Sequence, residues 1–578
     1  MRKRLSLWVL AAGLLVLAVP SQALGAVTRY ALSGGSSTDL SCTTTSAGCS
    51  LKHVLEDVVQ TGDEVIVMPG VHDVGAAGTD VRKDVSGLSI HGQDGQPRPT
   101  ITANSSQFVL TTCVLEPCSG NGTVLRHLAI SNSGTGGALA FWGGQAASPL
   151  TIEDVRAVGG SAGPAILGFG QTGVISFARI LNTTARTFAA GSNGSAIASE
   201  VDLTLRNVTA VASGAGADAL IQTPNCNDGI GCTANANSVV LNSILMGGPG
   251  GADVRTTSST NGCGSCVGNL LLDFSNFDST ANCIGCSINA PGSANNQTAA
   301  PLLVNLAGGD FHQLVGSPTI DAGVDDGGNG SADADGNPRK IGSAIDIGAF
   351  EDGHPRVATE PAANVTASGA TLRGSLNPVG FPTTYFFEWG PTTAYGNRVP
   401  TSDVSAGAGT VTQTVAQDLQ GLAPGTTLHY RLVAANLFGT VAGNDQSFTT
   451  LVPFVFTGVR LGVRVLVVRR GRFIRIPIPC PAGVTGSCAG RIRLVTASRV
   501  IVPSAGAAAR RKRITLGTAR FSVPAGSTKR TRLRLSRPAR KLVAVRHRLK
   551  VVATLTATAN ATTKRTRQRV TVRNPRRR

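Results

Sequence analysis

The stretch VLRHLAISN, at residues 124–132, is a short apolar run broken by one polar residue, and its shape recurs four more times along the chain. When His127, Asp154, Arg179, Asn207 and Asn242 are aligned, successive copies lie 27, 25, 28 and 35 residues apart. One period with loops of variable length is typical of a solenoid, in which each strand buries its apolar side chains by stacking on the next. The other copies are TIEDVRAVG (151–159), ISFARILNT (175–183), LTLRNVTAV (203–211) and VVLNSILMG (239–247).

A capping element precedes the repeats. Ser50 is placed to cap a short helix with one apolar face, and Gly62-Asp63 then turns the chain into the strand EVIVMPG. The first coil of a solenoid would otherwise expose an apolar end, so this order is typical of the entry to a right-handed parallel β-helix. The apolar face consists of Leu51, Val54, Leu55, Val58 and Val59.

Composition and the N-terminal residues favour an exported β protein. The chain has 578 residues, 71 of them glycine, with 4% aromatic and 15% charged residues, which suits several turn-rich β domains. Residues 1–26 combine Arg2, Lys3 and Arg4 with an apolar run and the small residues of SQALGA, the pattern of a secretory signal peptide. No later stretch predicts a transmembrane helix in the mature chain. We therefore expect a secreted, extracellular or surface-associated protein.

Charge is distributed unevenly along the chain. Residues 454–578 hold 32 of the 52 basic residues and none of the 33 acidic ones, so the remainder has 20 basic and 33 acidic residues, a net charge of −13. This asymmetry predicts a polyanionic partner for the basic part. Because no nucleic-acid-binding module is recognisable, an anionic cell-wall polymer or phospholipid surface is favoured over nucleic acid. The alternative is a sandwich whose outward face is simply rich in arginine.

Residues 317–351, SPTIDAGVDDGGNGSADADGNPRKIGSAIDIGAFE, carry a distinctive pattern. The segments SP at 317–318, IDAG at 320–323, DGNPR at 335–339 and DIGAFE at 346–351 resemble the closing signature of the choice-of-anchor Q family. Members of that family are secreted bacterial parallel β-helix proteins with interchangeable C-terminal attachment modules. The resemblance implies a right-handed parallel β-helix over residues 27–351. The family is defined by how its members are attached to a surface, so the resemblance implies no catalysed reaction.

Two further β units are expected downstream. Residues 355–450 resemble a fibronectin type III sandwich, with Trp389 expected at a buried early-strand position. Residues 454–578 alternate apolar and basic residues, with Leu533 and Leu535 expected to point inward, and resemble an immunoglobulin-like module of secreted actinobacterial proteins. The predicted fold is therefore all-β, a right-handed parallel β-helix followed by two β-sandwich domains.

The twelve cysteines fall into six local pairs, and an exported chain favours disulfides between them. The spacing of residues 263–286 also fits a zinc ribbon, so a tetrahedral metal site is the alternative there. Within this quartet, bridges could close small loops or tie one rung to the next. The pairs are Cys42/Cys49, Cys113/Cys118, Cys226/Cys232, Cys263/Cys266, Cys283/Cys286 and Cys480/Cys488.

The loop DDGGNGSADADGN, residues 325–337, is rich in oxygen donors. Asp326, Asp333 and Asp335 are the candidate calcium ligands. The loop misses the EF-hand pattern, because Ser331 would hold the first ligand position and no glutamate closes it. Asp-Gly and Asn-Pro are also ordinary turn formers, so a structural turn is favoured and no cofactor is predicted, with calcium as the alternative.

Two carboxylates in the repeats, Glu153 and Asp154, are weak candidates for catalysis. Sugar cleavage needs two facing carboxylates, or calcium with a strong base, and no acidic pair recurs in one column of the repeats. Arg126, Glu153 and Arg206 hold equivalent places and are interpreted as a solvated charge ladder between successive rungs.

Two neighbouring features have ordinary interpretations. His127 is interpreted as a strand-bend residue rather than a catalyst. Phe141-Trp142 is the conspicuous aromatic pair, and it suits a sugar platform, a cap or a core filler.

These features favour a non-enzymatic modular surface protein for display and binding. Glycans are its candidate ligands, and its basic C-terminal part would attach to anionic envelope polymers. The alternative is an exported polysaccharide lyase or hydrolase acting on the outer face of the β-helix, a hypothesis that depends on fold analogy.

Overall fold

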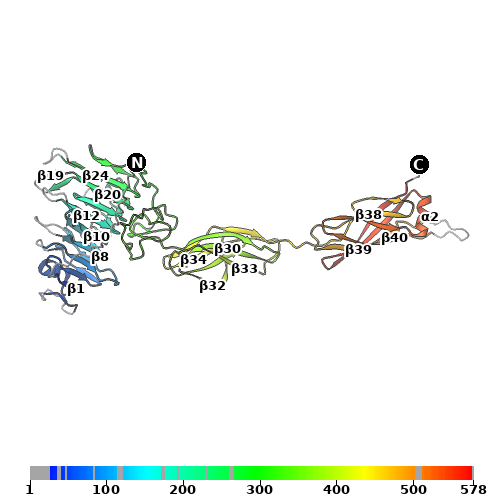
Figure 1. The fold of residues 1–578 in the computed structure, drawn as a ribbon, viewed down its shortest axis with the longest axis horizontal. Helices are drawn as coiled ribbons and strands as arrows, with labels where there is room; N and C mark the ends of the chain where they lie inside the picture. Colours follow the sequence, from blue (N-terminus) through cyan, green and yellow to red (C-terminus); the bar gives the residue numbers. More distant parts are fainter. Residues whose placement is uncertain are drawn as a thin grey trace, which may run out of the picture. The chain divides into compact units, whose positions relative to one another are not determined.

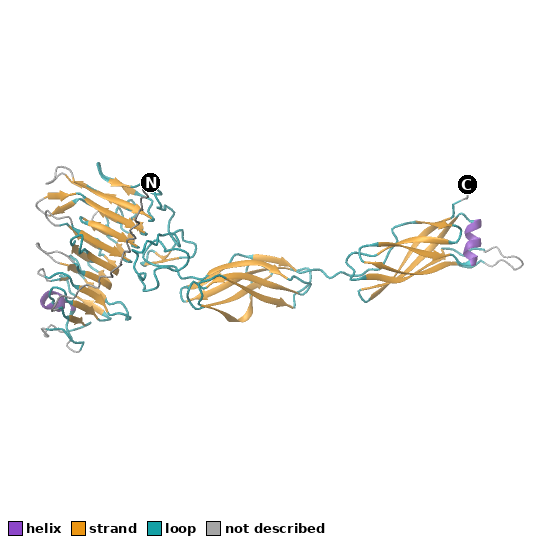
Figure 2. Cartoon of the chain, viewed as in Figure 1, coloured by secondary structure: helices purple, strands orange, loops and turns teal. Residues whose placement is uncertain are grey.

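The computed structural model describes residues 26–35, 41–45, 48–81, 85–112, 122–170, 176–191, 194–227, 231–259, 266–501 and 511–575. Strands dominate, as Figure 2 shows, and none of the helices among these residues has the length and apolar character of a membrane span. The predicted signal peptide lies almost entirely outside the described residues. The described chain divides into two compact units, one of residues up to 361, 372–417 and 429–446, the other of 362–371, 418–428 and residues from 447 on.

The strands of the N-terminal part of the chain are stacked on one another (Figure 1). Their pairing arranges them as parallel strands in three columns, so the predicted all-β fold with a leading parallel β-helix is confirmed. The first column runs through β1 (Thr28–Ala31), β2 (Glu64–Val67), β5 (Ser89–Gly92), β8 (Val124–Asn132), β10 (Leu150–Val158), β12 (Phe177–Leu181), β15 (Asp202–Arg206), β20 (Ala236–Leu241), β24 (Cys266–Asp273) and β26 (Ser287–Ile288). The second contains β3 (Val71–Asp73), β6 (Thr100–Ala103), the later halves of β8 and β10, β13 (Thr184–Thr187), β16 (Thr209–Ala212) and β21 (Ile244–Met246). The third contains β4 (Thr79–Asp80), β7 (Leu110–Thr112), β9 (Leu139–Trp142), β11 (Ile166–Phe169), β14 (Ile197–Ser199), β17 (Leu220–Gln222), β22 (Val254–Thr256) and β25 (Thr280–Ala281).

The polar residue in each repeat forms the corner between the first and second columns. His127, Asp154, Asn207 and Asn242 all have left-handed backbone conformations, with φ between 48° and 55°. Arg179 was expected in this column, and that alignment is wrong: Arg179 lies exposed in β12 opposite Thr151, and Asn182, with φ 47°, makes the corner. Asparagine adopts this conformation far more readily than arginine does.

The N-terminal cap forms as predicted. Ser50 Oγ accepts a hydrogen bond from His53 N at 3.3 Å and begins α1 (Leu51–His53), which continues as the π-helical turn η1 (Val54–Val58). Leu51, Val54 and Leu55 are buried against the same core as the first strands. The apolar end of the solenoid is thereby covered.

The described disulfides are local. Cys42–Cys49, Cys283–Cys286 and Cys480–Cys488 are bonded pairs, and Cys266 is also disulfide-bonded. Cys283 and Cys286 therefore close a loop within one rung and are not part of a zinc quartet. Cys226 lies opposite Cys232 in the hairpin of β18 (Asn225–Asn227) and β19 (Gly231–Ala234). Cys113, Cys118 and Cys263 lie outside the described residues.

The first sandwich pairs a three-stranded with a five-stranded sheet. Its fully buried aromatic side chains are Phe387 and Tyr430, and the Tyr430 hydroxyl donates to the Glu360 carbonyl at 2.5 Å. The expectation for Trp389 is wrong: it is only partly buried, because it lies next to the last residue of its strand. The strands are β29 (Arg356–Ala363), β30 (Gly369–Asn377) and β33 (Gln413–Gln420), then β32 (Asn397–Gly407), β31 (Thr383–Gly390), β34 (Thr427–Asn436), β35 (Gly439–Ala442) and β36 (Gln446–Thr449).

The C-terminal sandwich is one seven-stranded sheet that folds around its own core, with the helix α2 (Arg537–Val545) packed at one end. Leu533 and Leu535 are buried in this core as predicted. The strand order is β40 (Thr515–Pro524), β39 (Ser487–Thr496), β42 (Arg548–Ala559), β43 (Thr562–Arg573), β37 (Val465–Arg469), β38 (Phe473–Pro479) and β41 (Thr528–Arg534).

Candidate functional site

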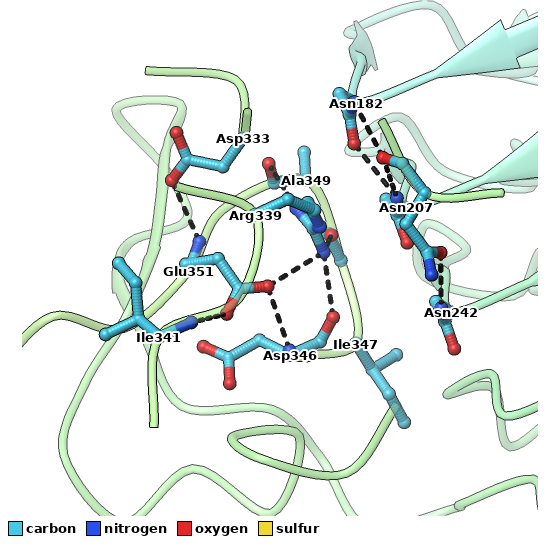
Figure 3. Close-up of polar contacts among 12 residues, drawn as sticks. Asn182, Asn207, Asn242, Asp333, Arg339, Ile341, Asp346, Ile347, Ala349 and Glu351 are labelled. Atoms are coloured by element: carbon cyan, nitrogen blue, oxygen red, sulfur yellow. Dashed lines mark hydrogen bonds and ion pairs between the residues drawn. The ribbon is translucent and has the colours of Figure 1, made fainter. Parts of the chain in front are cut away.

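The segment 317–351, which we call the closing segment, is bound to the asparagine corner of the β-helix. Asn329 is the central contact: its carbonyl accepts from Asn182 Nδ2 at 3.2 Å and Asn207 Nδ2 at 3.1 Å, and its Oδ1 accepts from Asn242 Nδ2 at 2.9 Å. Asn207 Nδ2 also donates to Asn182 Oδ1 at 3.0 Å, so the corner asparagines form a ladder (Figure 3). One buried residue of the closing segment thus ties three rungs together.

Arginines of the β-helix make a second set of contacts with the closing segment. Arg206 forms a two-bond ion pair with Asp326, at 2.5 and 3.0 Å, and Arg156 pairs with Asp335. Arg206 is 9% exposed, and strand register places Leu181 between Glu153 and Arg206. The interpretation of Arg126, Glu153 and Arg206 as a solvated ladder on successive rungs is therefore wrong for Arg206, whereas Arg126 and Glu153 do lie opposite one another on neighbouring strands. Its Arg206 member is a buried anchor for the closing segment.

A buried charge network holds the closing segment in its own conformation. Arg339, 3% exposed, donates to the carbonyls of Ala349, Asp346 and Gly348 at 3.1, 2.9 and 2.8 Å, and lies 3.2 Å from a Glu351 carboxylate oxygen (Figure 3). Burial raises the pKa of Glu351 to about 9 and that of Asp346 to about 7. Arg339, Asp346 and Glu351 therefore stabilise the conformation of the closing segment.

The three candidate calcium ligands each have a protein partner. Asp333 accepts backbone N–H bonds from Asp335, Asn337 and Glu351 at 2.8 to 3.0 Å, the pattern of a turn-forming carboxylate. The side-chain hydrogen bond from Arg206 lowers the pKa of Asp326, and burial raises that of Asp333. Among the described residues, no group of three or more His, Cys, Asp or Glu side chains is arranged to hold a metal ion. Calcium binding remains an untested alternative to the structural turn.

A histidine that contacts the closing segment predicts a pH dependence of stability. His312 on β28 (Asp310–Gln313), which pairs with β27 (Leu303–Asn305), lies 2.5 Å from both Asp310 and Asp335 and packs on the Phe350 ring. Burial alone would lower the pKa of His312, but its hydrogen bonds to the two carboxylates raise it. The stabilisation that protonated His312 gives the folded state is therefore fully present below about pH 6.5. It is lost as the pH rises through the folded-state pKa of His312.

We expect the substitution His312→Gln to abolish the loss of stability that the wild-type β-helix shows as the pH rises. The wild-type β-helix should lose about 1 kcal/mol or less between mildly acidic and mildly basic pH, because the imidazole is partly exposed, and the variant should show a flatter profile. Thermal unfolding at a series of pH values measures it. Equal slopes for the two proteins would contradict the assignment.

The outer face of the β-helix has a cleft of about 570 Å³ beside the corner column, and the closing segment forms one of its walls. Glu153 and Asp154 both line it, so the structure brings the predicted carboxylate pair into one concave site with Arg126 and His127. The remaining lining residues are Asp94, Gly95, Gln96, Asn182, Ser331, Ala332, Asp333, Asp335 and Gly336.

The two carboxylates differ in their environment. Asp154 is held by Arg98 Nη2 at 2.5 Å and by His127 Nδ1 at 2.7 Å. Burial raises the pKa of Glu153, against the opposing effect of Arg126. A hydrogen-bonded, anchored carboxyl group beside one with a raised pKa is chemically able to hold a polyol or donate a proton. His127 forms a strand bend as predicted and also orients Asp154.

The aromatic pair does not form an exposed platform. Phe141 is fully buried in the core, and Trp142 is partly buried and stacks on Phe169 of the next rung at 4.7 Å between ring centroids. Of the three interpretations of this pair, the core filler is correct for Phe141.

The C-terminal sandwich presents an arginine-rich surface that we call the arginine trough. Its walls are exposed arginines on β39 and β43, and its floor is two threonines on β42, the strand between them. Two hollows of about 490 and 390 Å³ lie along it and share Arg493, Thr554 and Arg565. The trough comprises Arg491, Arg493, Thr554, Thr556, Arg565 and Arg567.

Sequence reasoning missed these particular residues. The alternation in RIR (491–493) and RTR (565–567) predicts outward arginines, but only the strand register shows that the two columns flank the same threonines. A second basic groove, of about 890 Å³, includes Arg475, Arg530 and Arg532 on β38 and β41. There Arg532 is stacked on Phe473, with 4.3 Å from Cζ to the ring centroid.

Comparisons with known proteins do not assign an activity to this chain. No protein-family model matches it, and no curated protein matches it. Among solved structures, pectate lyase Pel9A is 12% identical with a TM-score of 0.28, covering 56% of this chain and 96% of that one. The sensor domain of the anti-sigma factor RsgI4 from Pseudobacteroides cellulosolvens is 19% identical (17% and 96% covered, TM-score 0.15). A two-domain fibronectin type III segment of chicken tenascin is 14% identical (38% and 98% covered, TM-score 0.13).

Proposed function

We propose that this chain is a secreted modular surface protein whose C-terminal sandwich attaches it to an anionic envelope polymer, while the β-helix is displayed for binding. The observation that carries the proposal is the arginine trough, in a segment of 32 basic residues and no acidic residue. Its guanidinium groups have no carboxylate within residues 454–578 to neutralise them, so they attract external anions. The local disulfides support an oxidising, extracellular location.

The cleft at Glu153 and Asp154 is the geometry that supports a binding role for the β-helix. Its carboxylates and amide groups suit a polyol such as a polysaccharide. Cleavage of a polysaccharide is the less favoured alternative, because Asp154 is already engaged by Arg98 and His127.

Retention of the full chain by isolated cell envelopes tests the attachment. We expect the protein to sediment with the envelopes and to be released by raised salt or by an excess of free polyglutamate, because surface charge contacts are screened. Retention that is insensitive to both treatments would show that the attachment is not ionic and would contradict the proposal.

A further inference from the structure

We propose that the arginine trough binds a linear polyphosphodiester whose successive phosphates are joined through three carbon atoms, as in poly(glycerol phosphate). This inference depends on the proposed attachment and specifies its ligand. It is carried by the arrangement of guanidinium and hydroxyl groups across three neighbouring strands.

The trough contains two equivalent rows of side chains. In one, Arg493 and Arg567 flank Thr554. Directly opposed residues of antiparallel strands point to the same face, so each threonine is flanked by an arginine on either neighbouring strand. Arg493 Nη2 also donates to Thr515 Oγ1 on β40 at 2.9 Å. In the other row, Arg491 and Arg565 flank Thr556.

Each row suits a phosphate better than a carboxylate. Neighbouring strands are about 4.8 Å apart, so the two arginine columns lie about 10 Å from one another, with the anion between them. A phosphodiester can accept hydrogen bonds from both sides through its free oxygens, and the planar guanidinium fork matches them in pairs. A carboxylate presents both of its oxygens in one direction and is less suited to two opposing forks.

The distance between the rows also matches such a polymer. The rows are two residues apart along each strand, which is about 6.7 Å. Two phosphorus atoms joined through a three-carbon unit are separated by six covalent bonds, the same number as two residues of backbone, and extend to about 7 Å. In a polyuronate the carboxylates are attached beside rigid rings and successive ones point to different sides of the chain. An extended phosphate polymer can therefore place one anion on each row.

Single-stranded nucleic acid has the same six-bond spacing but is less suited to this surface. Proteins that bind it without sequence preference stack the bases on aromatic side chains. The trough offers arginine and threonine, with Val552 and Val495 beyond one end. The floor is thus too short and polar to act as a stacking platform, which favours a polyol phosphate.

Binding of the full chain to immobilised poly(glycerol phosphate), polygalacturonate and poly-dT tests the inference. The trough variant replaces Arg491, Arg493, Arg565 and Arg567 with serine. The control variant replaces Arg475, Arg530, Arg532 and Arg534 on β38 and β41, so both lose four positive charges.

We expect poly(glycerol phosphate) to bind about tenfold more tightly than polygalacturonate at equal charge concentration. The trough variant should lose about 100-fold in affinity and the control variant less than about threefold. Equal affinity for the two polymers would overturn the phosphate assignment and leave trough attachment intact. Tighter binding of poly-dT would make nucleic acid the ligand and overturn the inference. Equal losses in both variants would overturn the location as well, and no binding to any polyanion would sink the proposed function itself.

Discussion

Replacing Arg339 with methionine is expected to destabilise the closing segment and the rungs beneath it by about 4 kcal/mol. Methionine fills a similar volume but leaves three buried carbonyls, of Asp346, Gly348 and Ala349, without their donor. It also removes the only guanidinium that the described structure places on the buried Glu351 carboxyl.

Hydrogen exchange of backbone amides in the rungs measures this effect without requiring the whole chain to unfold in one step. Lys340 provides a matched control, because it is the next residue, is half-exposed, and makes one surface ion pair with Asp325 at 3.3 Å. Lys340→Met should change stability by less than about 0.5 kcal/mol. Equal protection of the rungs in Arg339→Met and wild type would contradict the structural role of the network.

Replacing Asn207 with alanine is expected to cost about 3 kcal/mol. The change removes two buried hydrogen bonds. It takes away the Asn207 donor from Asn182 Oδ1, leaves the Asn329 carbonyl with its bond from Asn182 Nδ2, and places alanine at a φ of 54°. Asn207→Gly should be less harmful by about 1 kcal/mol, because glycine adopts this conformation freely.

Hydrogen exchange of the two Asn207 variants separates the contribution of the lost hydrogen bonds from that of the left-handed backbone conformation. Asn269 is a control, because its side chain makes a similar bond to Asn237 Oδ1 at 3.0 Å on the surface of the stack. Asn269→Ala should cost less than about 1 kcal/mol. An equal loss of stability in Asn269→Ala and Asn207→Ala would contradict the proposed stabilising role of the corner asparagines.

Local patterns predicted much of the fold. Five apolar runs with a polar interruption predicted the β-helix, and Ser50 with its apolar stripe predicted the cap. Period alone placed Arg179 in the corner column, whereas the left-handed preference of asparagine would have pointed to Asn182. Close cysteine pairs predicted local bridges such as Cys283–Cys286.

Contacts between distant residues could not be predicted in this way. Asn329 lies 147 residues from Asn182 and 122 from Asn207, and nothing in their local sequence indicates that they meet. The role of 317–351 as a strap across the rungs therefore required the structure. The arginine trough depends likewise on register among strands up to about 75 residues apart, here Arg491 and Arg565 around Thr556. The cleft around Glu153 and Asp154 exists because the closing segment forms its second wall.

The salt dependence of polyanion binding tests the central claim, that the trough arginines contact the envelope polymer, most directly. For the full chain on immobilised poly(glycerol phosphate), the logarithm of the affinity should fall linearly with the logarithm of the salt concentration. Serine at Arg491, Arg493, Arg565 and Arg567 should reduce that slope by about three units, because each arginine no longer displaces a counterion, whereas the four-serine control on β38 and β41 should leave it within about one unit. An unchanged slope in the trough variant, or equal reductions in both variants, would contradict the claim.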